Sequence, residues 1–260
     1  MITPKIPLLK DGQILSVDVV NSIIKRTEYA GDLLKQYKLI AGNEMYVEPH
    51  YDGTRVSYLQ PVGGGGTPAT GDMYIGIAAS TGAAFSIQSI SGISINGQTA
   101  NIGILLGAAS QQSPGAFLLT TNIGGQVGAI WALNKASSPS FTAQFSYAIG
   151  GASQADGITL IFSPKIFLGG GGGGLGYQGG LTNSVAVEID IFRNSPFDPN
   201  NSHIAVLKGG DVTTHLAIAS PTVRPSGTLS VTYSNKILNV FHNGIQIISY
   251  GIDIPSIIGQ

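Results

Sequence analysis

The stretch VAVEIDIFRNSPFDPNNSHIAV, residues 185–206, governs the interpretation of the whole chain. It begins as an apolar run of β-strand residues, and a strand points alternate side chains to opposite faces. The two faces differ in character: Val185, Val187, Ile189 and Ile191 lie on one, and Ala186, Glu188, Asp190 and Phe192 on the other. Glu188 and Asp190 are therefore neighbours, and like charges raise each other's pKa unless a cation lies between them.

Further polar residues follow this strand at close spacing. Asn194, Asp198 and His203 are separated by turn-forming Ser, Pro and Asn, so the loop can fold back onto Glu188 and Asp190. Carboxylates with an amide oxygen and a backbone carbonyl suit Ca²⁺, and carboxylates with one imidazole suit Mn²⁺ or a similar transition ion. Two neighbouring metals that share Asp190 and Asp198 would account for every polar residue. The alternative is a solvated strand end followed by a polar loop.

The composition narrows the class of protein. Charged residues make up 10% of the 260 residues, and 37 residues are glycine; ordinary soluble domains have about 25% charged residues. This composition favours a β-rich protein with many turns. With a net charge of −1 and no cluster of Lys and Arg, the chain offers no surface for nucleic acid. Because cysteine is absent, disulfides, zinc–thiolate sites and thiol nucleophiles are excluded.

The lengths of the apolar runs and the first residues bear on membrane insertion and export. No apolar run approaches the roughly 18 residues of a membrane span. The first residues, MITPKIPLLKDGQ, lack the apolar segment of a secretory signal. We therefore expect a soluble protein with no membrane partner. If it acts outside a cell, we expect it to leave by a route other than ordinary export.

Residues 1–60 predict a small head made of one helix and one hairpin. The helix spans residues 17–41, and its apolar side chains follow the 3-4 spacing of a short coiled coil. Self-association through this seam and an amphipathic helix packed on its own domain are the two alternatives. A two-residue hairpin turn follows at Asp52-Gly53. A Gly- and Pro-rich linker over residues 61–72 separates this head from the rest of the chain.

From residue 73 onward the chain predicts many short strands, which is typical of a sandwich or a barrel. SFTAQFSYAIGG, residues 140–151, puts one set of side chains on a single face: Phe141, Ala143, Phe145, Tyr147 and Ile149. Turns are expected at Ser234-Asn235 and Asn243-Gly244. The six glycines at 169–174 are not a phosphate loop, since neither Lys-Ser/Thr nor a helix start follows. They predict a loop whose backbone approaches another group closely.

Three segments, in this order along the chain, resemble the hallmark segments of the L-type (legume-type) lectins: ADGITLIFSP at 155–164, GGGLGY at 172–177, and residues 185–206. The flanking strands LLTTNIGGQVGAIWAL and GTLSVTYSNKILNV are similar too, so the resemblance covers about residues 75–255. It implies an all-β fold, a concanavalin-like jelly-roll β-sandwich over residues 73–260, preceded by the helix-and-hairpin head. The head matches no part of the lectin pattern.

The resemblance also implies site residues. The transition-metal ligands would be Glu188, Asp190, Asp198 and His203, and the calcium ligands Asp190, the Phe192 carbonyl, Asn194 and Asp198. The sugar would lie against Asp156, which in the family follows a cis peptide bond, with Asn194 and the Gly173 N–H as donors and the Phe192 ring against its apolar side. The metals would shape the site rather than perform a reaction. His215 has no acidic neighbour in the sequence, so nothing in the pattern links it to this site.

One departure concerns the end of the chain. Lectins of this family continue with further strands and a loop beyond the point that matches YGIDIPSIIGQ, residues 250–260. Either the sequence is truncated there, or the N-terminal strands or a neighbouring chain supply the missing side of the sugar site.

A lectin domain joined by a glycine linker to such a head resembles a bacteriophage tail fibre or baseplate adhesin, by analogy of architecture. This resemblance implies a non-enzymatic, metal-dependent protein of the virion that binds cell-surface glycan outside the cell, at the host surface. Residues 1–60 would attach to other virion structural proteins and form a homo-oligomer, for example a trimer.

Two alternative functions are open. The first is a structural virion protein whose vestigial lectin fold binds only neighbouring subunits; the intact Asp156 and Asn194 count against it. The second is a glycoside hydrolase of the β-glucanase type, whose strand Glu-x-Asp-x-Glu is very similar to EIDIF. Retaining hydrolysis needs two carboxyls about 5–5.5 Å apart. Phe192 stands where the third acid would be, which disfavours catalysis.

Overall fold

The computed structural model describes residues 45–46, 60–61, 72–133, 135–137, 139–151 and 154–259, and the chain divides into two compact units, Met1–Thr67 and Pro68–Gln260. In the first unit, β1 (Met45–Tyr46) pairs antiparallel with β2 (Gln60–Pro61). The predicted helix at 17–41, the Asp52-Gly53 turn and most of the linker lie outside the described residues.

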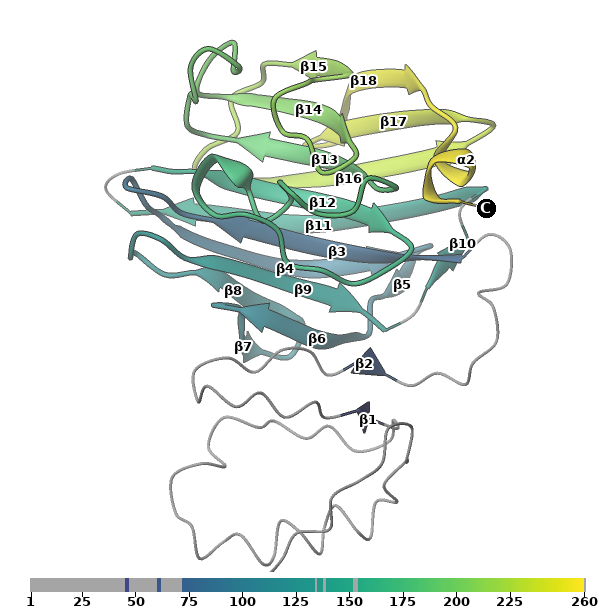
Figure 1. Ribbon diagram of the computed structural model, residues 1–260, viewed down its shortest axis with the longest axis horizontal. Coiled ribbons are helices and arrows are strands. Elements are labelled where there is room, and N and C mark those ends of the chain that lie inside the picture. Colours follow the sequence, from purple (N-terminus) through teal and green to yellow (C-terminus); the bar gives the residue numbers. More distant parts are fainter. Residues whose placement is uncertain are drawn as a thin grey trace, which may run out of the picture. The chain divides into compact units, whose positions relative to one another are not determined.

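The second unit is a sandwich of two antiparallel sheets that lie face to face (Figure 1). The first, here called the β13 sheet, has the order β15 (Ala217–Ala219), β14 (His203–Lys208), β13 (Val185–Asp190), β12 (Gly157–Ser163), β3 (Asp72–Ser80), β9 (Val127–Ala132) and β6 (Ile102–Gly107), with β10 (Ala136–Ser137) beside β3. The second, the β11 sheet, has the order β18 (Ile245–Gly251), β17 (Ile237–His242), β16 (Ser226–Ser234), β11 (Ser140–Gly150), β4 (Ile87–Ile95), β8 (Ala116–Thr120) and β7 (Ser110–Ser113), with β5 (Gln98–Thr99) beside β4. The prediction of an all-β sandwich is confirmed.

The main core lies between the two sheets, and the predicted strand alternation builds it. On β11, the five side chains expected on one face are all buried there: Phe141, Ala143, Phe145, Tyr147 and Ile149. On β13, the core side is formed by Val185, Val187 and Ile189, with Ile191 just beyond the strand. Fully burying such a side chain contributes about 1.5–3 kcal/mol to folding. These apolar faces therefore hold the sheets together.

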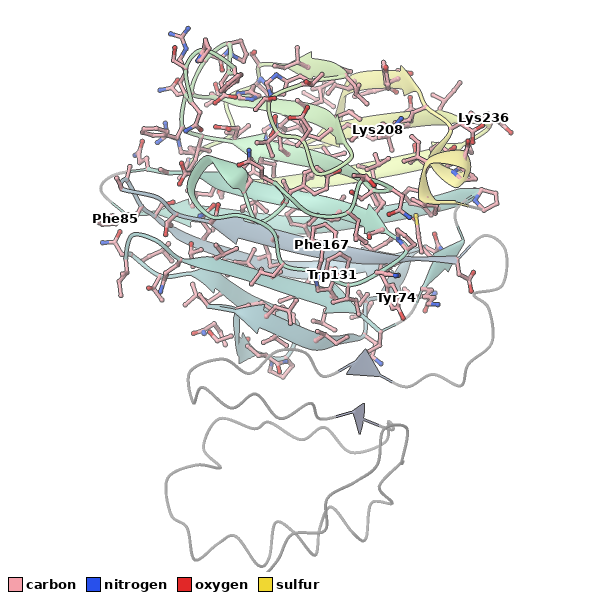
Figure 2. All side chains as sticks on the ribbon, in the orientation of Figure 1. Tyr74, Phe85, Trp131, Phe167, Lys208 and Lys236 are labelled. Carbon is pink, nitrogen blue, oxygen red and sulfur yellow. The ribbon has the colours of Figure 1, made fainter. Side chains whose placement is uncertain are left out.

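A second, smaller core covers the outer face of the β13 sheet. Loops that follow β12 and β14 lay Phe167, Tyr177 and Val212 over Trp131 and Ala186. Trp131 and Phe167 lie together on this face (Figure 2), with ring centroids 5.5 Å apart, and the indole Nε1 donates a hydrogen bond of 3.0 Å to the Phe167 carbonyl. Because of this covering layer, the outward-facing side chains of β13 are buried as well.

The described chain ends in a short helix, α2 (Ile254–Ile258). The Asp253 side chain caps its N-terminus, and Ile254 and Ile258 are buried in the main core. Tyr233 ties the helix to β16, because its hydroxyl donates to the Ile252 carbonyl and accepts from the Ile254 N–H. Among the residues that the structure describes, no helix has the length and apolar character needed to cross a membrane.

Candidate functional site

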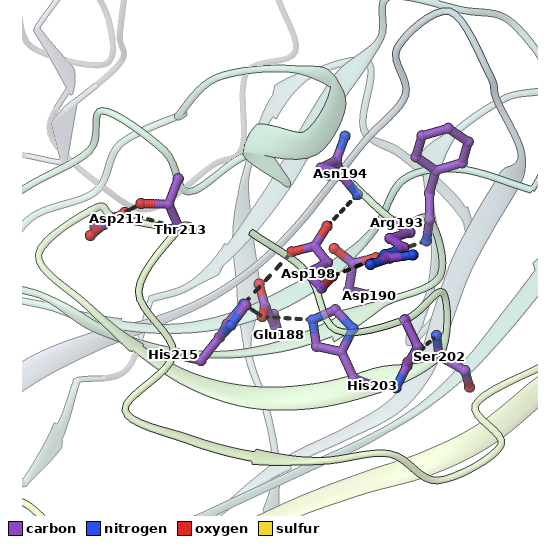
Figure 3. Close-up of polar contacts among 12 residues, drawn as sticks. Glu188, Asp190, Arg193, Asn194, Asp198, Ser202, His203, Asp211, Thr213 and His215 are labelled. Carbon is purple, nitrogen blue, oxygen red and sulfur yellow. Dashed lines mark hydrogen bonds and ion pairs between the residues drawn. The ribbon is translucent and has the colours of Figure 1, made fainter. Parts of the chain in front are cut away.

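A cluster of acids and imidazoles lies on the outer face of the β13 sheet (Figure 3). Antiparallel pairing sets Asp190 of β13 opposite His203 of β14, so their side chains share a face. Glu188 lies two residues earlier on that face, with Oε1 3.3 Å from His203 Nε2. Asp198 enters from the loop between the strands. All four residues are at most 4% exposed, so the fold brings together the acids and the imidazole that the sequence predicted as ligands.

His215 also belongs to this cluster, although no sequence pattern pointed to it. The loop after β14 returns its Nε2 to within 3.0 Å of Glu188 Oε1 and 3.8 Å of Asp198 Oδ1. Its ring lies edge-on to that of His203, with centroids 5.2 Å apart. The expectation that nothing links His215 to the site is therefore wrong. One sequence feature could have indicated this contact. Gly209-Gly210 follows the apolar strand β14 and forms a turn, so the next residues, including His215, run back beside that strand.

The loop after β13 orients the carboxylates through its own backbone. The Phe192 N–H donates to Asp190 Oδ1 at 2.7 Å, and the Asn194 N–H donates to Asp198 Oδ2. Arg193 Nε donates to the Asp198 carbonyl at 3.2 Å, which closes the loop on itself. Asn194 is thereby tied through its backbone to a residue of the cluster.

The cluster is an unfavourable place for negative charge. Burial raises the pKa of Asp190 to about 9, with a further contribution from the neighbouring Glu188 charge and opposition from the Phe192 N–H. Burial also raises the pKa of Asp198. Contact with Glu188 raises the pKa of His215. A cation bound here would remove this penalty, because it would favour the ionised carboxylates.

Several buried polar atoms in this region have no hydrogen-bond partner among the described residues. They are Glu188 Oε1, both ring nitrogens of His203, His215 Nε2, Asn194 Oδ1 and Asp156 Oδ2. Each such atom costs about 1–3 kcal/mol when it stays unpaired. Imidazole nitrogens with carboxylate oxygens fit a transition ion, and the oxygens of Asp190, Asp198 and Asn194 fit calcium. The residues present thus suit both predicted cations.

Asp156 lies beside the cluster at the start of β12. The Ala155–Asp156 peptide bond is cis, as the resemblance implied. Three hydrogen bonds fix this peptide: Asp156 N–H to the Ser80 carbonyl at 3.0 Å, Ile191 N–H to the Asp156 carbonyl at 3.0 Å, and Ser86 Oγ to the Ala155 carbonyl at 2.7 Å. Burial raises the pKa of Asp156 to about 6, and the Gly82 backbone opposes the shift.

The glycine run packs its backbone against Asn194. Gly173 lies in the short 3-10 helix η2 (Gly172–Gly174), where an added Cβ would come within 2.7 Å of Asn194 Cγ and Oδ1. The Gly172 N–H donates to the Thr81 carbonyl and the Gly174 N–H to the Gly171 carbonyl, whereas the Gly173 N–H has no partner among the described residues. The close approach expected of this loop is therefore an approach to the Asn194 amide.

Phe192 differs from the acids that precede it. Its side chain is 37% exposed, so the ring lies at the surface beside the cluster. Phe192 follows Glu188 and Asp190 at the same spacing of two, so this strand has no third carboxylate. The roles of its carbonyl toward calcium and of its ring toward sugar stay predictions.

A family model, that of the legume lectin domain, matches residues 125–258, which is just over half of the chain. The match includes β9 to β18 and every member of the acid and imidazole cluster: Glu188, Asp190, Asp198, His203 and His215. The chain belongs to the legume lectin family.

Proposed function

We propose that this legume lectin domain binds carbohydrate at Asp156, Gly173 and Asn194, with calcium and a transition metal holding these residues in place. The observation that carries the proposal is the position of Asn194. Its amide lies against Gly173, and its backbone N–H is bonded to Asp198 of the acid cluster. The side chain that would touch sugar is thus joined directly to the residues that would bind cations.

The polar groups around Asn194 match the chemistry of a sugar hydroxyl, which both donates and accepts hydrogen bonds. Asp156 Oδ2 is an acceptor and the Gly173 N–H a donor, each without a partner among the described residues. The Phe192 ring, 37% exposed, offers an apolar surface to a pyranose. Bound cations would neutralise the carboxylates and fix Asn194 through its side-chain oxygen. With Phe192 in place of a third acid, binding is favoured over hydrolysis.

The wider role that we propose is that of an adhesin on a phage virion, in a tail fibre or baseplate, that recognises glycan on the host surface. Its support is the sequence of residues 1–60, which departs from the lectin pattern and ends in a Gly- and Pro-rich linker. That head would join the domain to other virion proteins and to copies of itself. Several copies would raise the avidity of a shallow site that alone binds with about millimolar affinity.

A glycan array with the full chain, before and after EDTA, tests the carbohydrate site. We expect glycan binding that EDTA removes. Circular dichroism should still show the folded sandwich after EDTA, because the apolar core between the sheets stabilises it without metal. Asp156→Ala should remove binding and leave the metal content unchanged. Asp253→Asn, at the exposed cap of α2 where Asn also serves as a cap, is the matched control and should behave as the wild type.

Other outcomes favour the alternatives. Binding that survives both EDTA and Asp156→Ala would refute the site. No binding to any glycan would favour a structural virion protein, and release of reducing sugar from a β-glucan would favour the hydrolase.

A further inference from the structure

We propose that His215 is a direct ligand of the transition metal, so that Glu188, His203 and His215 supply one carboxylate and two imidazoles to the same ion. This inference rests on the metal centre of the proposed function and adds a ligand to it. It also changes which ion the centre prefers.

The first support is the spacing of the three ligand atoms. Glu188 Oε1 lies 3.0 Å from His215 Nε2 and 3.3 Å from His203 Nε2, and all three atoms lie within 4.8 Å of one another. With metal–ligand bonds of about 2.1 Å, adjacent ligand atoms are about 3.0 Å apart in an octahedron and about 3.4 Å apart in a tetrahedron. The observed separations are those of neighbours around a single ion.

The second support is the way these atoms are buried. His215 is 10% exposed and the other two side chains are at most 1% exposed. Each of the three atoms is buried without a hydrogen-bond partner among the described residues. His215 Nε2 and Glu188 Oε1 are thus close together without the alignment of a hydrogen bond. Two imidazoles approach one carboxylate from different sides (Figure 3), which is the arrangement of three ligands around an ion.

The third support is the order of the loop that carries His215. Gly209 and Gly210, with φ of 72° and 70°, turn the chain at the end of β14. Asp211 Oδ1 then accepts hydrogen bonds from the N–H and the hydroxyl of Thr213, at 2.8 and 2.7 Å. On the far side, the Leu216 N–H donates to the Val206 carbonyl at 2.9 Å. His215 is therefore held from both sides, as a preorganised ligand should be.

A second imidazole ligand should shift the preference of the site away from Mn²⁺. Carboxylate and water ligands suit Mn²⁺, whereas imidazole suits Zn²⁺, Ni²⁺ and Cu²⁺, which also stand higher in the general affinity order. We therefore expect the wild-type chain to favour Zn²⁺ or Co²⁺ over Mn²⁺ by a wider margin than a variant with one imidazole.

The test compares the metal-stripped full chain with His215→Gln, each titrated with Zn²⁺, Co²⁺ and Mn²⁺ in calcium buffer by calorimetry. Loss of a residue that only supports a metal ligand lowers metal affinity roughly 10–100-fold. Loss of a direct ligand in His215→Gln should lower the Zn²⁺ affinity by at least as much. Mn²⁺ affinity should fall less, so the Zn²⁺/Mn²⁺ ratio decreases. The visible spectrum of the Co²⁺ form should also change. Ile218→Gln, at an exposed site on β15, is the control for disturbance of the loop and should keep both the ratio and the spectrum.

A second variant guards against misfolding. In His215→Ala, added free imidazole should restore the Co²⁺ spectrum, as expected when a ligand rather than a fold is missing. An unchanged ratio and spectrum in His215→Gln would overturn the role of His215 and leave the metal centre intact. A wild-type chain that binds no transition ion would overturn the role of His215 and the metal part of the proposed function together.

Discussion

Strand β13 buries both of its faces, yet the two faces are stabilised in different ways. The inner face places Val187 and Ile189 in the core between the sheets, where burial of uncharged side chains is favourable whatever the pH or the metal content. The outer face places Glu188 and Asp190 under loops, where burial is unfavourable for charge. One face therefore holds the fold, while the other lies under covering loops and, in the proposed function, would be neutralised by cations.

The largest effect should come from Asp198→Ala on the outer face. That carboxylate is assigned to both cations and also accepts from the Asn194 N–H, so its loss should abolish both metal sites and glycan binding. Elemental analysis of the purified variant measures the first and the glycan array the second. Two ions per chain in the variant would contradict the shared assignment, and Asp253→Asn again serves as the control.

A substitution on the inner face should lower stability and leave metal binding unchanged. Ile189→Ala should lower the free energy of unfolding by about 2–5 kcal/mol, the cost of truncating a fully buried side chain. Denaturant titration measures this loss. The chain that remains folded should still bind its metals, because the side chain points away from the cluster. A loss of metal without a loss of stability would break the proposed separation between the faces.

The stability of the metal-stripped chain should depend on pH, because Asp190 on the outer face ionises with a raised pKa. The pKa of Asp190 is about 9 in the folded chain and about 4 when unfolded, so between these values the folded state binds the extra proton. The contribution of Asp190 to stability is therefore fully present below pH 4 and is lost as the pH rises through 9, by up to about 1.4 kcal/mol per pH unit. Metal-loaded protein should not show this slope. Thermal unfolding at several pH values, with and without metal, is the measurement.

The smallest effect concerns the contact between the glycine loop and Asn194. In Gly173→Ala the new methyl group overlaps the Asn194 amide and displaces it. Glycan affinity should fall on the order of 10-fold, equivalent to about 1.4 kcal/mol. Stability should change little, because only the end of the half-buried Asn194 side chain has to move aside. Gly170→Ala is the control, because it lies in the same glycine run, has no positive φ, and its added Cβ would make only ordinary contacts, at 3.5 and 3.8 Å.

Local pattern was enough to predict the strands and which side chains of β13, β14 and the loop between them come together. The alternation of β11 and β13 held along their whole length, and the turn at Asn243-Gly244 falls between β17 and β18 as expected. The other turn was off by one residue: Asn235 and Lys236, both at positive φ, link β16 to β17, because β16 includes Ser234. Alternation and turn residues act over a few positions, which is why short sequence windows reveal them.

Contacts made by a returning loop could not be predicted in the same manner. Glu188 and His215 are far apart in the sequence, and their contact depends on the outer loops folding over the sheet. The second core of Trp131, Phe167 and Tyr177 arises in the same way, from loop residues with no periodic pattern. Identifying either requires knowing which strand lies beside which, and that is a property of the whole sheet.

The position of Asn194 also has a thermodynamic consequence. If one residue takes part in both sugar binding and cation binding, the two equilibria are linked, and the linkage is reciprocal. Whatever factor the cation adds to the affinity for sugar, the sugar adds to the affinity for the cation. A domain seated on glycan would thus bind its ions more tightly than a free one, so stripping the attached protein should need a higher concentration of chelator.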